Sequence, residues 1–388
     1  MKIVFSTRPA YGHVYPLVPM ALAARDAGHE VSIATTGEFL SRVAMLGFTT
    51  IDVGISIEEG RARLLASLSA EEMPKAADGR PDIELGARLF FDVVAPRTAA
   101  DLAPVLAALE PDFVVYEQFD PGAAVAAHAA GIPAICHALS PRLPDEVMWA
   151  AAAGDHLERL WAEHGVASPS FDVFIGDAYL DIFPAPLQPP AFLRHPARLS
   201  VRPIPFAEPG ALLPPWIGAS GRPLVYVTLG TVVGTDDVLR PIVEGVGSLD
   251  ADVLLALGSA DGADLGPLPS NVHVEPFVDQ PAVLCHADLA VHHGGSGTLL
   301  GALTHATPQL LLPKGADQFW NADLVARAGL AEVLEPADVT AKAVTEAAGS
   351  ALAERRPTLE AVRAEIAAMP SPAEVVEVLE GLEELPAA

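Results

Sequence analysis

The sequence predicts an α/β protein with two doubly wound domains, each built on a parallel β-sheet. Strand-like apolar segments alternate with helical segments along most of the chain, and 388 residues exceed what one hydrophobic core usually supports. A proline-rich stretch at 183–223 interrupts this alternation near the middle. We therefore expect an N-terminal domain at 1–205, a linker at 206–222, a second domain at 223–356 and a helical tail at 357–388.

In the first domain, short apolar runs bounded by turn residues predict strands, and runs with a 3.6-residue period predict helices. Gly28 is a suitable C-cap for the predicted helix 14–27. Pro16 is suited to the first turn of the same helix. The predicted elements are strand 2–6, helix 14–27, strand 30–35, strand 111–117, helix 122–131 and strand 132–139.

After the proline-rich stretch the same pattern returns. The predicted elements are strand 223–231, helix 238–249, strands 252–258, 271–277 and 287–293, a helix from 296, and strand 307–313. Ligands of doubly wound sheets bind at the carboxyl ends of the strands. Residues that directly follow strands are therefore the candidates for a site.

The composition limits the classes of partner. The chain has 23 basic against 50 acidic residues and a formal net charge of -27, which would repel nucleic acid and anionic membrane surfaces. Its apolar runs are too short to cross a bilayer and it opens without a leader pattern, so we expect a cytosolic protein. Cys136 and Cys285 each lie beside an apolar run, which predicts reduced, buried thiols.

A glycine-rich turn, VHHGGSGT at 291–298, joins a predicted strand to a predicted helix. The free backbone N–H groups at the start of a helix bind phosphate with little need for Lys or Arg, which suits so acidic a chain. Ser296 and Thr298 add hydroxyl donors, and the absence of side chains lets the backbone approach a ligand at Gly294, Gly295 and Gly297.

The two histidines of this turn also suggest a metal site or a plain strand end. Along a strand, His286 and His293 would lie about 23 Å apart, too far to share a metal ion. Adjacent residues of a strand point to opposite faces, so only one of His292 and His293 addresses a ligand. We favour a phosphate-binding role for His293 and leave the strand-end interpretation open.

The turn after the first strand, STRPAYGHVYP, lacks the G-x-G-x-x-G pattern of dinucleotide-binding proteins, which disfavours an oxidoreductase. It contains His13, which by itself is more often structural. A histidine with an ordinary pKa suits proton removal near neutrality, so a phosphate turn facing it favours a general base. Glu117 and Asp120, at the end of another strand, are the candidate orienting carboxylates.

Two acidic segments remain. Asp317 and Gln318 follow a predicted strand, and a carboxylate beside a carboxamide suits several sugar hydroxyls; the alternative is an N-cap pair for the next helix. Asp250 and Asp252 lie at the amino end of their strand, the wrong end for a ligand, so we interpret them as a surface turn rather than as ligands of a divalent ion.

The chain resembles family 1 glycosyltransferases, in particular the bacterial enzymes that decorate natural products such as polyketides and macrolides. The motifs that carry the resemblance are GHVYPLVPMALAARDAGHEV, VYVTLGT, NVHVEPFVDQPAVL, HHGGSGT and LLLPKGADQFWNA. The likeness spans nearly the whole chain and is weakest at about 55–110 and 140–215. It implies a GT-B fold, with an acceptor-binding first domain, a nucleotide-sugar-binding second domain and a tail that crosses back onto the first.

The resemblance also implies roles for single residues. His13 falls at the general base, and Glu117 at its orienting aspartate, with Asp120 as the reserve. The remaining positions belong to the donor: the diphosphate and nucleotide at Thr231, Phe277, Val278, Gln280, His293, Gly295, Ser296, Gly297 and Thr298, and the sugar hydroxyls at Asp317 and Gln318. Asp279 replaces a proline that is frequent in the base-binding segment.

The implied reaction is transfer of a sugar with inversion and without a metal cofactor, from a nucleoside diphosphate sugar to an apolar aglycone oxygen or carbon. Gly301 replaces a glutamate that binds the ribose hydroxyls in many uridine-dependent members, which favours a thymidine diphosphate sugar. The expected acceptor-binding residues are Phe90, Phe91, Phe119, Leu143, Met148 and Trp149, which are equally suited to a core. We expect a homodimer. The alternatives to the glycosyltransferase function are a nucleotide-sugar epimerase and a silent activator of a partner transferase.

Overall fold

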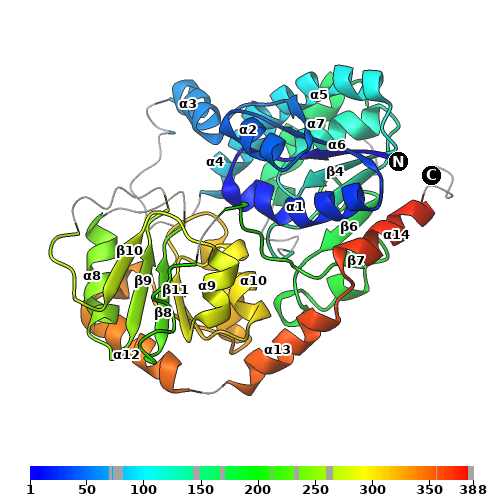
Figure 1. The fold of residues 1–388 in the computed structure, drawn as a ribbon. Helices are drawn as coiled ribbons and strands as arrows, with labels where there is room; N and C mark the ends of the chain where they lie inside the picture. Colours follow the sequence, from blue (N-terminus) through cyan, green and yellow to red (C-terminus); the bar gives the residue numbers. More distant parts are fainter. Residues whose placement is uncertain are drawn as a thin grey trace. The chain divides into compact units, whose positions relative to one another are not determined.

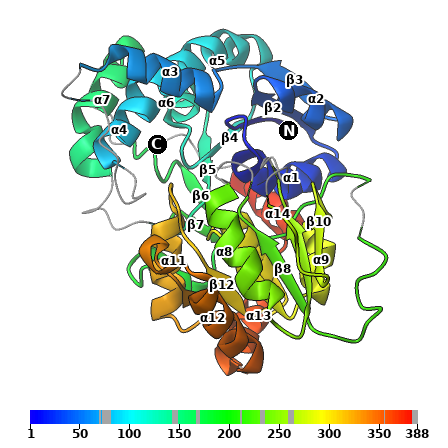
Figure 2. The same cartoon turned by 90° about the vertical axis from the view of Figure 1, so that its left-hand side faces the viewer.

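The computed structural model describes residues 1–69, 72, 82–142, 149–166, 171–210, 213–230, 236–258, 265–354 and 356–382. They form two compact units (Figures 1 and 2). The first contains the described residues within Met1–Lys75, Asp82–Arg202 and Met369–Ala388, and the second contains those within Pro203–Ala368. Within these ranges, no helix is both long and apolar enough to cross a lipid bilayer.

The first unit is a seven-stranded sheet in which every neighbouring pair is parallel. Its strands, in spatial order, are β3 (Thr49–Asp52), β2 (Glu30–Thr35), β1 (Lys2–Ser6), β4 (Phe113–Glu117), β5 (Ala134–His137), β6 (Ala178–Asp181) and β7 (Arg198–Ser200). The predicted strands at 2–6 and 30–35 are confirmed residue for residue.

Helices connect these strands. They are α1 (Tyr11–Asp26), α2 (Glu38–Met45), α3 (Ile57–Ser67), α4 (Ile83–Ala87), α5 (Ala95–Leu109), α6 (Pro121–Ala129), α7 (Trp149–Glu163) and α14 (Pro372–Leu382). A π-helical segment, η1 (Arg88–Val94), joins α4 to α5, and two short 3₁₀ turns, η2 (Ala185–Leu187) and η3 (Phe192–Arg194), lie between β6 and β7. Helices α1 and α14, from opposite ends of the chain, pack side by side (Figure 1).

The second unit repeats this architecture with a six-stranded parallel sheet. Its strands, in spatial order, are β10 (Val272–Glu275), β9 (Asp252–Ala256), β8 (Leu224–Thr228), β11 (Leu289–His292), β12 (Gln309–Leu311) and β13 (Glu332–Val333). Its helices are α8 (Asp236–Gly247), α9 (Gln280–His286), α10 (Ser296–Thr304), α11 (Gln318–Arg327), α12 (Ala341–Ala353) and α13 (Pro357–Ala368), with the 3₁₀ turn η5 (Pro336–Asp338). The predicted pair of doubly wound parallel sheets is confirmed.

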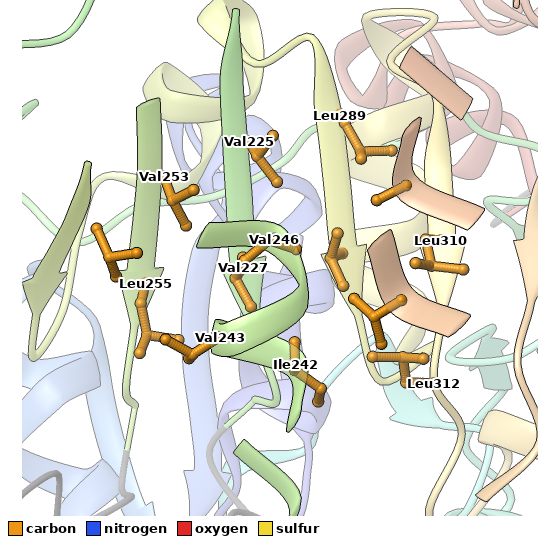
Figure 3. Close-up of a cluster of buried hydrophobic side chains, with 14 of the residues drawn as sticks. Val225, Val227, Ile242, Val243, Val246, Val253, Leu255, Leu289, Leu310 and Leu312 are labelled. Carbon is orange, nitrogen blue, oxygen red and sulfur yellow. The ribbon is translucent and has the colours of Figure 1, made fainter. Parts of the chain in front are cut away.

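The core of the second unit follows from the two-residue period of its strands. Val225 and Val227 point to the face covered by α8 and α12 (Figure 3), while Leu224 and Tyr226 point to the face covered by α9 and α10. Both faces of the sheet are therefore buried, which is why its strands read as nearly continuous apolar runs.

Three local expectations are wrong. Helix α1 begins at Tyr11, so Pro16 lies inside the helix rather than in its first turn, because burial of one helix face outweighs the hydrogen bond that proline lacks. Cys136 is buried as expected, but Cys285 is exposed at the end of α9. Asp252 is not on a surface turn: it opens β9, is 6% exposed, and pairs with Arg222.

The proline-rich stretch is structured in part. Its first half contains η2, η3 and the edge strand β7, which pairs with β6. The compact units divide between Arg202 and Pro203, and again between α13 and Met369.

Candidate active site

The candidate residues of the first unit lie where its strand order reverses. The sheet runs outward in one direction from β1 and in the other from β4, and these two strands are neighbours. Ser6, the last residue of β1, pairs with Tyr116, so the loop after β1 and Glu117 leave the sheet side by side. In doubly wound sheets such a reversal leaves room for a ligand at the carboxyl ends of the strands.

His13 and Glu117 meet at this point. The histidine Nδ1 lies 2.9 Å from Glu117 Oε1, and the His13 side chain is 22% exposed while that of Glu117 is completely buried. A carboxylate accepts a proton donor, so this contact assigns the ring proton to Nδ1 and leaves the Nε2 lone pair for a substrate. The arrangement is that of a general base held by a carboxylate.

Glu117 forms an ion pair with Arg8 in addition to its contact with His13. Arg8 Nε donates to the same oxygen, Oε1, at 2.9 Å, and the backbone N–H of Phe119 donates to Oε2 at 2.6 Å. Burial opposes ionisation of Glu117, but the positive charge of Arg8 and the hydrogen bonds from His13 and Phe119 outweigh it and hold its pKa at about 2. The carboxylate is therefore ionised at neutral pH. We call Arg8, His13 and Glu117 the base cluster.

Asp120, the reserve partner for His13, has a different role. Its Oδ2 accepts a 2.6 Å hydrogen bond from Ser6 Oγ, and its Oδ1 caps the first turn of α6 at the N–H of Ala123. Burial, aided by the negative charge of Glu117, raises the pKa of Asp120 to about 6. Of the two predicted carboxylates, it is Glu117 that contacts His13.

The predicted aromatic residues separate into two groups. Phe119 lies 6.4 Å from the His13 ring and 6.2 Å from Phe90, between ring centroids, and both phenylalanines are partly exposed beside the base cluster. Phe91 is 2% exposed and packs against Phe174 in the core, so we withdraw it from the acceptor-binding set. Leu143, Met148 and the side chain of Trp149 lie outside the described residues.

In the second unit the strand order reverses between β8 and β11, and the glycine turn follows β11. Gly294 has a φ of 90°, which favours glycine, and Gly295 is the N-cap of α10. The first N–H groups of α10, at Ser296, Gly297 and Thr298, have no acceptor within the helix, as at any helix start. Added side-chain atoms at Gly297 would meet open space, so the backbone there is approachable.

The two histidines of the turn differ as expected from strand alternation. His292 is fully buried; its Nε2 lies 2.9 Å from Gln309 Oε1, and its Nδ1 accepts from the N–H of Gly294. Burial lowers the pKa of His292 to about 3, so it is neutral and structural. Burial, and to a smaller extent the charge of Lys314, also lowers the pKa of His293 to about 4. The His293 ring beside the glycine turn is therefore neutral at pH 7.

Two glycines enclose the His293 ring. A Cβ atom at Gly230, in the loop after β8, would lie 2.7 Å from His293 Cε1, and one at Gly295 would lie 2.4 Å from Nε2. Real Cβ atoms do not approach this closely. The ring orientation therefore depends on glycine at both positions.

Asp317 and Gln318 lie beside the glycine turn. Asp317 Oδ2 accepts from Ser296 Oγ at 3.2 Å and from Asn321 Nδ2 at 3.1 Å, while Asn321 also donates to the carbonyl of Gly294. Gln318 is 6% exposed, and its Oε1 accepts from the backbone N–H groups of Lys314 and Gly315. These contacts tie the loop before α11 to the turn.

The expected base-binding segment follows β10. Phe277 is 57% exposed, Val278 packs against the core, and Gln280 Nε2 donates to Tyr226 Oη and Thr298 Oγ1, each at 3.1 Å. Asp279 caps α9 through the N–H of Ala282, which explains a polar residue at a position where proline is frequent. Thr231 lies outside the described residues.

Sequence reasoning missed three polar residues of these clusters: Arg8, Lys314 and Asn321. Lys314 Nζ is buried with no hydrogen-bond partner among the described residues, and its burial lowers its pKa to about 8. The sequence signal for Asn321 was its i,i+4 spacing from Asp317. The signal for Arg8 and Lys314 was their position shortly after predicted strands, in a chain that has few Lys and Arg residues. Across the described ranges, no group of three or more His, Cys, Asp or Glu is placed to hold a metal ion.

Family models and known proteins match nearly the whole chain. The N- and C-terminal domain models of the erythromycin biosynthesis protein CIII-like family match residues 22–230 and 240–382. The elloramycin glycosyltransferase ElmGT of Streptomyces olivaceus is 31% identical, over 97% of this chain and 96% of that protein.

Solved structures agree with these matches. The glycosyltransferase SnogD from Streptomyces nogalater superposes with a TM-score of 0.77 at 30% identity, covering 99% of both chains. The glycosyltransferase VinC, in complex with DTDP, superposes with a TM-score of 0.76 at 28% identity, covering 99% of this chain and 100% of that one.

The fold and these matches define a glycosyltransferase of the GT-B class. The chain belongs to the erythromycin biosynthesis protein CIII-like family of bacterial natural-product glycosyltransferases.

The raised pKa of Asp120 gives a testable pH dependence of stability. Because the folded state favours the protonated acid, the ionised carboxylate destabilises the fold progressively as the pH rises from the ordinary aspartate value toward 6. Asp120→Asn keeps an acceptor for Ala123 and cannot ionise. We expect its stability gain over the wild type to grow by about 1 kcal/mol between pH 5 and pH 7.5, measured by urea unfolding.

Asp279→Asn is the matched control, because Asp279 also caps a helix but is partly exposed to water. Its effect on stability should be nearly the same at both pH values. An equal effect of Asp120→Asn at both pH values would contradict the assignment.

Proposed function

We propose that this chain transfers a sugar, with inversion and without a metal cofactor, from a thymidine diphosphate sugar to a hydroxyl group of an apolar natural-product aglycone. The observation that carries the proposal is the 2.9 Å contact between His13 and the buried Glu117 carboxylate, next to two partly exposed aromatic rings. The members of the family compared above are glycosyltransferases, and one of them was solved with DTDP.

In the proposed reaction His13 Nε2 removes the proton of the acceptor hydroxyl as its oxygen attacks the anomeric carbon of the sugar. Glu117 holds the ring through Nδ1 and stabilises the imidazolium that forms. The bond between the anomeric carbon and the diphosphate oxygen breaks as the new glycosidic bond forms on the opposite face. One displacement of this kind inverts the configuration at that carbon.

The leaving diphosphate is assigned to the glycine turn. The N–H groups at the start of α10, the neutral ring of His293 and the buried ammonium of Lys314 are suited to stabilise the developing negative charge. They supply the electrostatic role that a divalent ion has in metal-dependent transferases. Asp317, fixed by Ser296 and Asn321, is assigned to the sugar hydroxyls.

The most direct test is incubation of the protein with a panel of thymidine diphosphate sugars and aromatic polyketide aglycones, followed by mass spectrometry. A glycosylated aglycone supports the proposal. An isomerised nucleotide sugar formed without any acceptor would point to an epimerase instead.

His13→Ala tests the base assignment. We expect kcat to fall about 10²- to 10⁴-fold, because general-base catalysis is lost, while the affinity for thymidine diphosphate stays unchanged. Transfer rates and calorimetric titrations measure the two effects. His195→Ala, which removes an exposed imidazole outside both clusters, is the control; equal rates in His13→Ala and the wild type would refute the assignment.

The environment of Gly301 predicts the nucleotide preference. This residue is buried in α10 and supplies no acid to bind ribose hydroxyls, and Leu284 Cδ1 lies 2.8 Å from where its Cβ would be, so a side chain there would displace the leucine. A 2′-hydroxyl without a partner weakens binding by about 1–3 kcal/mol. Calorimetry should show tighter binding of thymidine diphosphate and deoxyuridine diphosphate than of uridine diphosphate; equal affinities would sink this inference.

Lys314→Met tests the cation of the donor site. Loss of a charge-assisted hydrogen bond should weaken thymidine diphosphate binding by about tenfold or more. Because burial lowers the pKa of Lys314 to about 8, wild-type affinity should fall as the pH rises from 7 to 9. Lys314→Arg should keep its affinity through this range, since arginine stays protonated.

The control for Lys314 is Lys342→Met, which removes an exposed lysine from α12. Unchanged affinity in Lys314→Met, or the same pH dependence in that variant as in the wild type, would exclude the lysine from the diphosphate site.

A further inference from the structure

Arg8 is a buried cation with unused donors. Its side chain is 3% exposed, and Nε donates to Glu117 Oε1. The two terminal nitrogens, Nη1 and Nη2, are also buried, and neither has a hydrogen-bond partner in the described part of the chain. One guanidinium edge is therefore engaged by Glu117, and the remaining N–H donors are not.

Such donors are unusual in a folded protein. Buried polar groups nearly always have partners, and an unsatisfied donor on a charged group costs more free energy than one on a neutral group. A role limited to holding Glu117 would need only the Nε–H. The surplus donors indicate that a further oxygen is bound at this position in the working enzyme.

The surroundings of Arg8 indicate where that oxygen would come from. The Phe90 ring lies over the guanidinium, 4.1 Å from Cζ to the ring centroid, and the Phe119 ring lies 5.9 Å away. Both rings lie within cation–π distance of the guanidinium, but an aromatic ring does not replace hydrogen-bond acceptors in the plane of the cation. Phe119 also neighbours His13, so Arg8 and the proposed base border the same aromatic pair.

The segment that carries Phe90 has an uncommon backbone. It is the π-helical η1, between α4 and α5, and π-helical turns inside helices are frequent at functional sites. Phe90 is partly exposed, whereas its neighbour Phe91 is in the core. Phe90 packs at the margin of the cluster formed by Ala87 and Phe91, and rotation of its side chain would uncover the guanidinium.

We infer that Arg8 is an acceptor-binding residue that recognises a carbonyl or phenolate oxygen next to the hydroxyl group to be glycosylated. The inference rests on the proposed function, in which His13 takes the proton of that hydroxyl. Arg8 and His13 both contact Oε1 of Glu117, so they lie close together. An aglycone with two neighbouring oxygens can present one to each: the hydroxyl to His13 Nε2 and the carbonyl to the terminal nitrogens of Arg8. Phe90 turns aside as the aglycone enters.

The test uses two probes with one ring skeleton, 1-hydroxyanthraquinone and 1-anthrol, of which only the first has a carbonyl beside its hydroxyl. Their affinities are measured by fluorescence titration without any sugar donor, for the wild type, Arg8→Met, Arg8→Lys and the control Arg97→Met. Arg97 is a half-exposed arginine on α5 that pairs with Asp101. Thermal unfolding and thymidine diphosphate binding establish that each variant is folded.

We expect Arg8→Met to weaken binding of the quinone about tenfold and that of the anthrol less than twofold, with no effect of Arg97→Met. Arg8→Lys should retain part of the preference, because it keeps the charge but not the two-pronged edge. Equal losses for both probes, or none, in Arg8→Met and Arg8→Lys would overturn the inference.

The assay separates this inference from the proposed function, because it needs no transfer. If the quinone preference is lost in the Arg8 variants but no sugar is transferred by the wild type, the binding site stands and the reaction does not. If His13→Ala loses transfer but the Arg8 variants discriminate the probes like the wild type, the reaction stands and the role of Arg8 falls.

Discussion

The base cluster of the first unit and the glycine-turn site of the second each depend on a reversal of strand order at the centre of a parallel sheet. The first sheet grows outward in opposite directions from β1 and β4, and the second from β8 and β11. The loops that leave each pair therefore diverge, and the carboxyl ends of the two strands remain accessible. This is how His13 and Glu117, more than a hundred residues apart in sequence, come to share a hydrogen bond. The second unit repeats the device with the loops that carry Gly230 and His293.

The chain is strongly acidic, yet it keeps two cations with buried nitrogen atoms just after strands, Arg8 after β1 and Lys314 after β12. Arg8 and Lys314 each have nitrogen atoms without a partner in the described ranges, while many of the other basic side chains form ion pairs at the surface. In a chain of net charge -27, a cation that is held out of water provides local positive charge against an acidic background. In the proposals above, each unit uses one such cation to bind an electron-rich oxygen.

The sequence predicted the elements better than the contacts. Strand periodicity and turn residues were sufficient for the four central strands of the first sheet, for five strands of the second and for the glycine turn, because backbone pairing follows the local pattern. They missed the short outer strands β3, β6, β7 and β13. The local pattern could not predict whether Glu117 or Asp120 contacts His13. That depends on the register of β1 and β4, which directs the Glu117 side chain toward His13 and leaves Asp120 to Ser6. Phe90 and Phe91 are neighbours of the same type, and only the folded structure shows that Phe91 is the one in the core. The burial of the Lys314 ammonium likewise depends on packing between the loop before α11 and the turn, which no local pattern records.

The narrow space around the His293 ring couples three positions, Gly230, His293 and Gly295, in evolution. Its walls, Gly230 and Gly295, come from different loops, and each leaves less space than a methyl group would need. A descendant of this protein cannot gain a side chain at either wall and keep the ring in place. Nor can it lose the ring without leaving a flat void between two loops. These three residues should therefore change together or not at all as the family diverges, whatever sugar or aglycone each member uses.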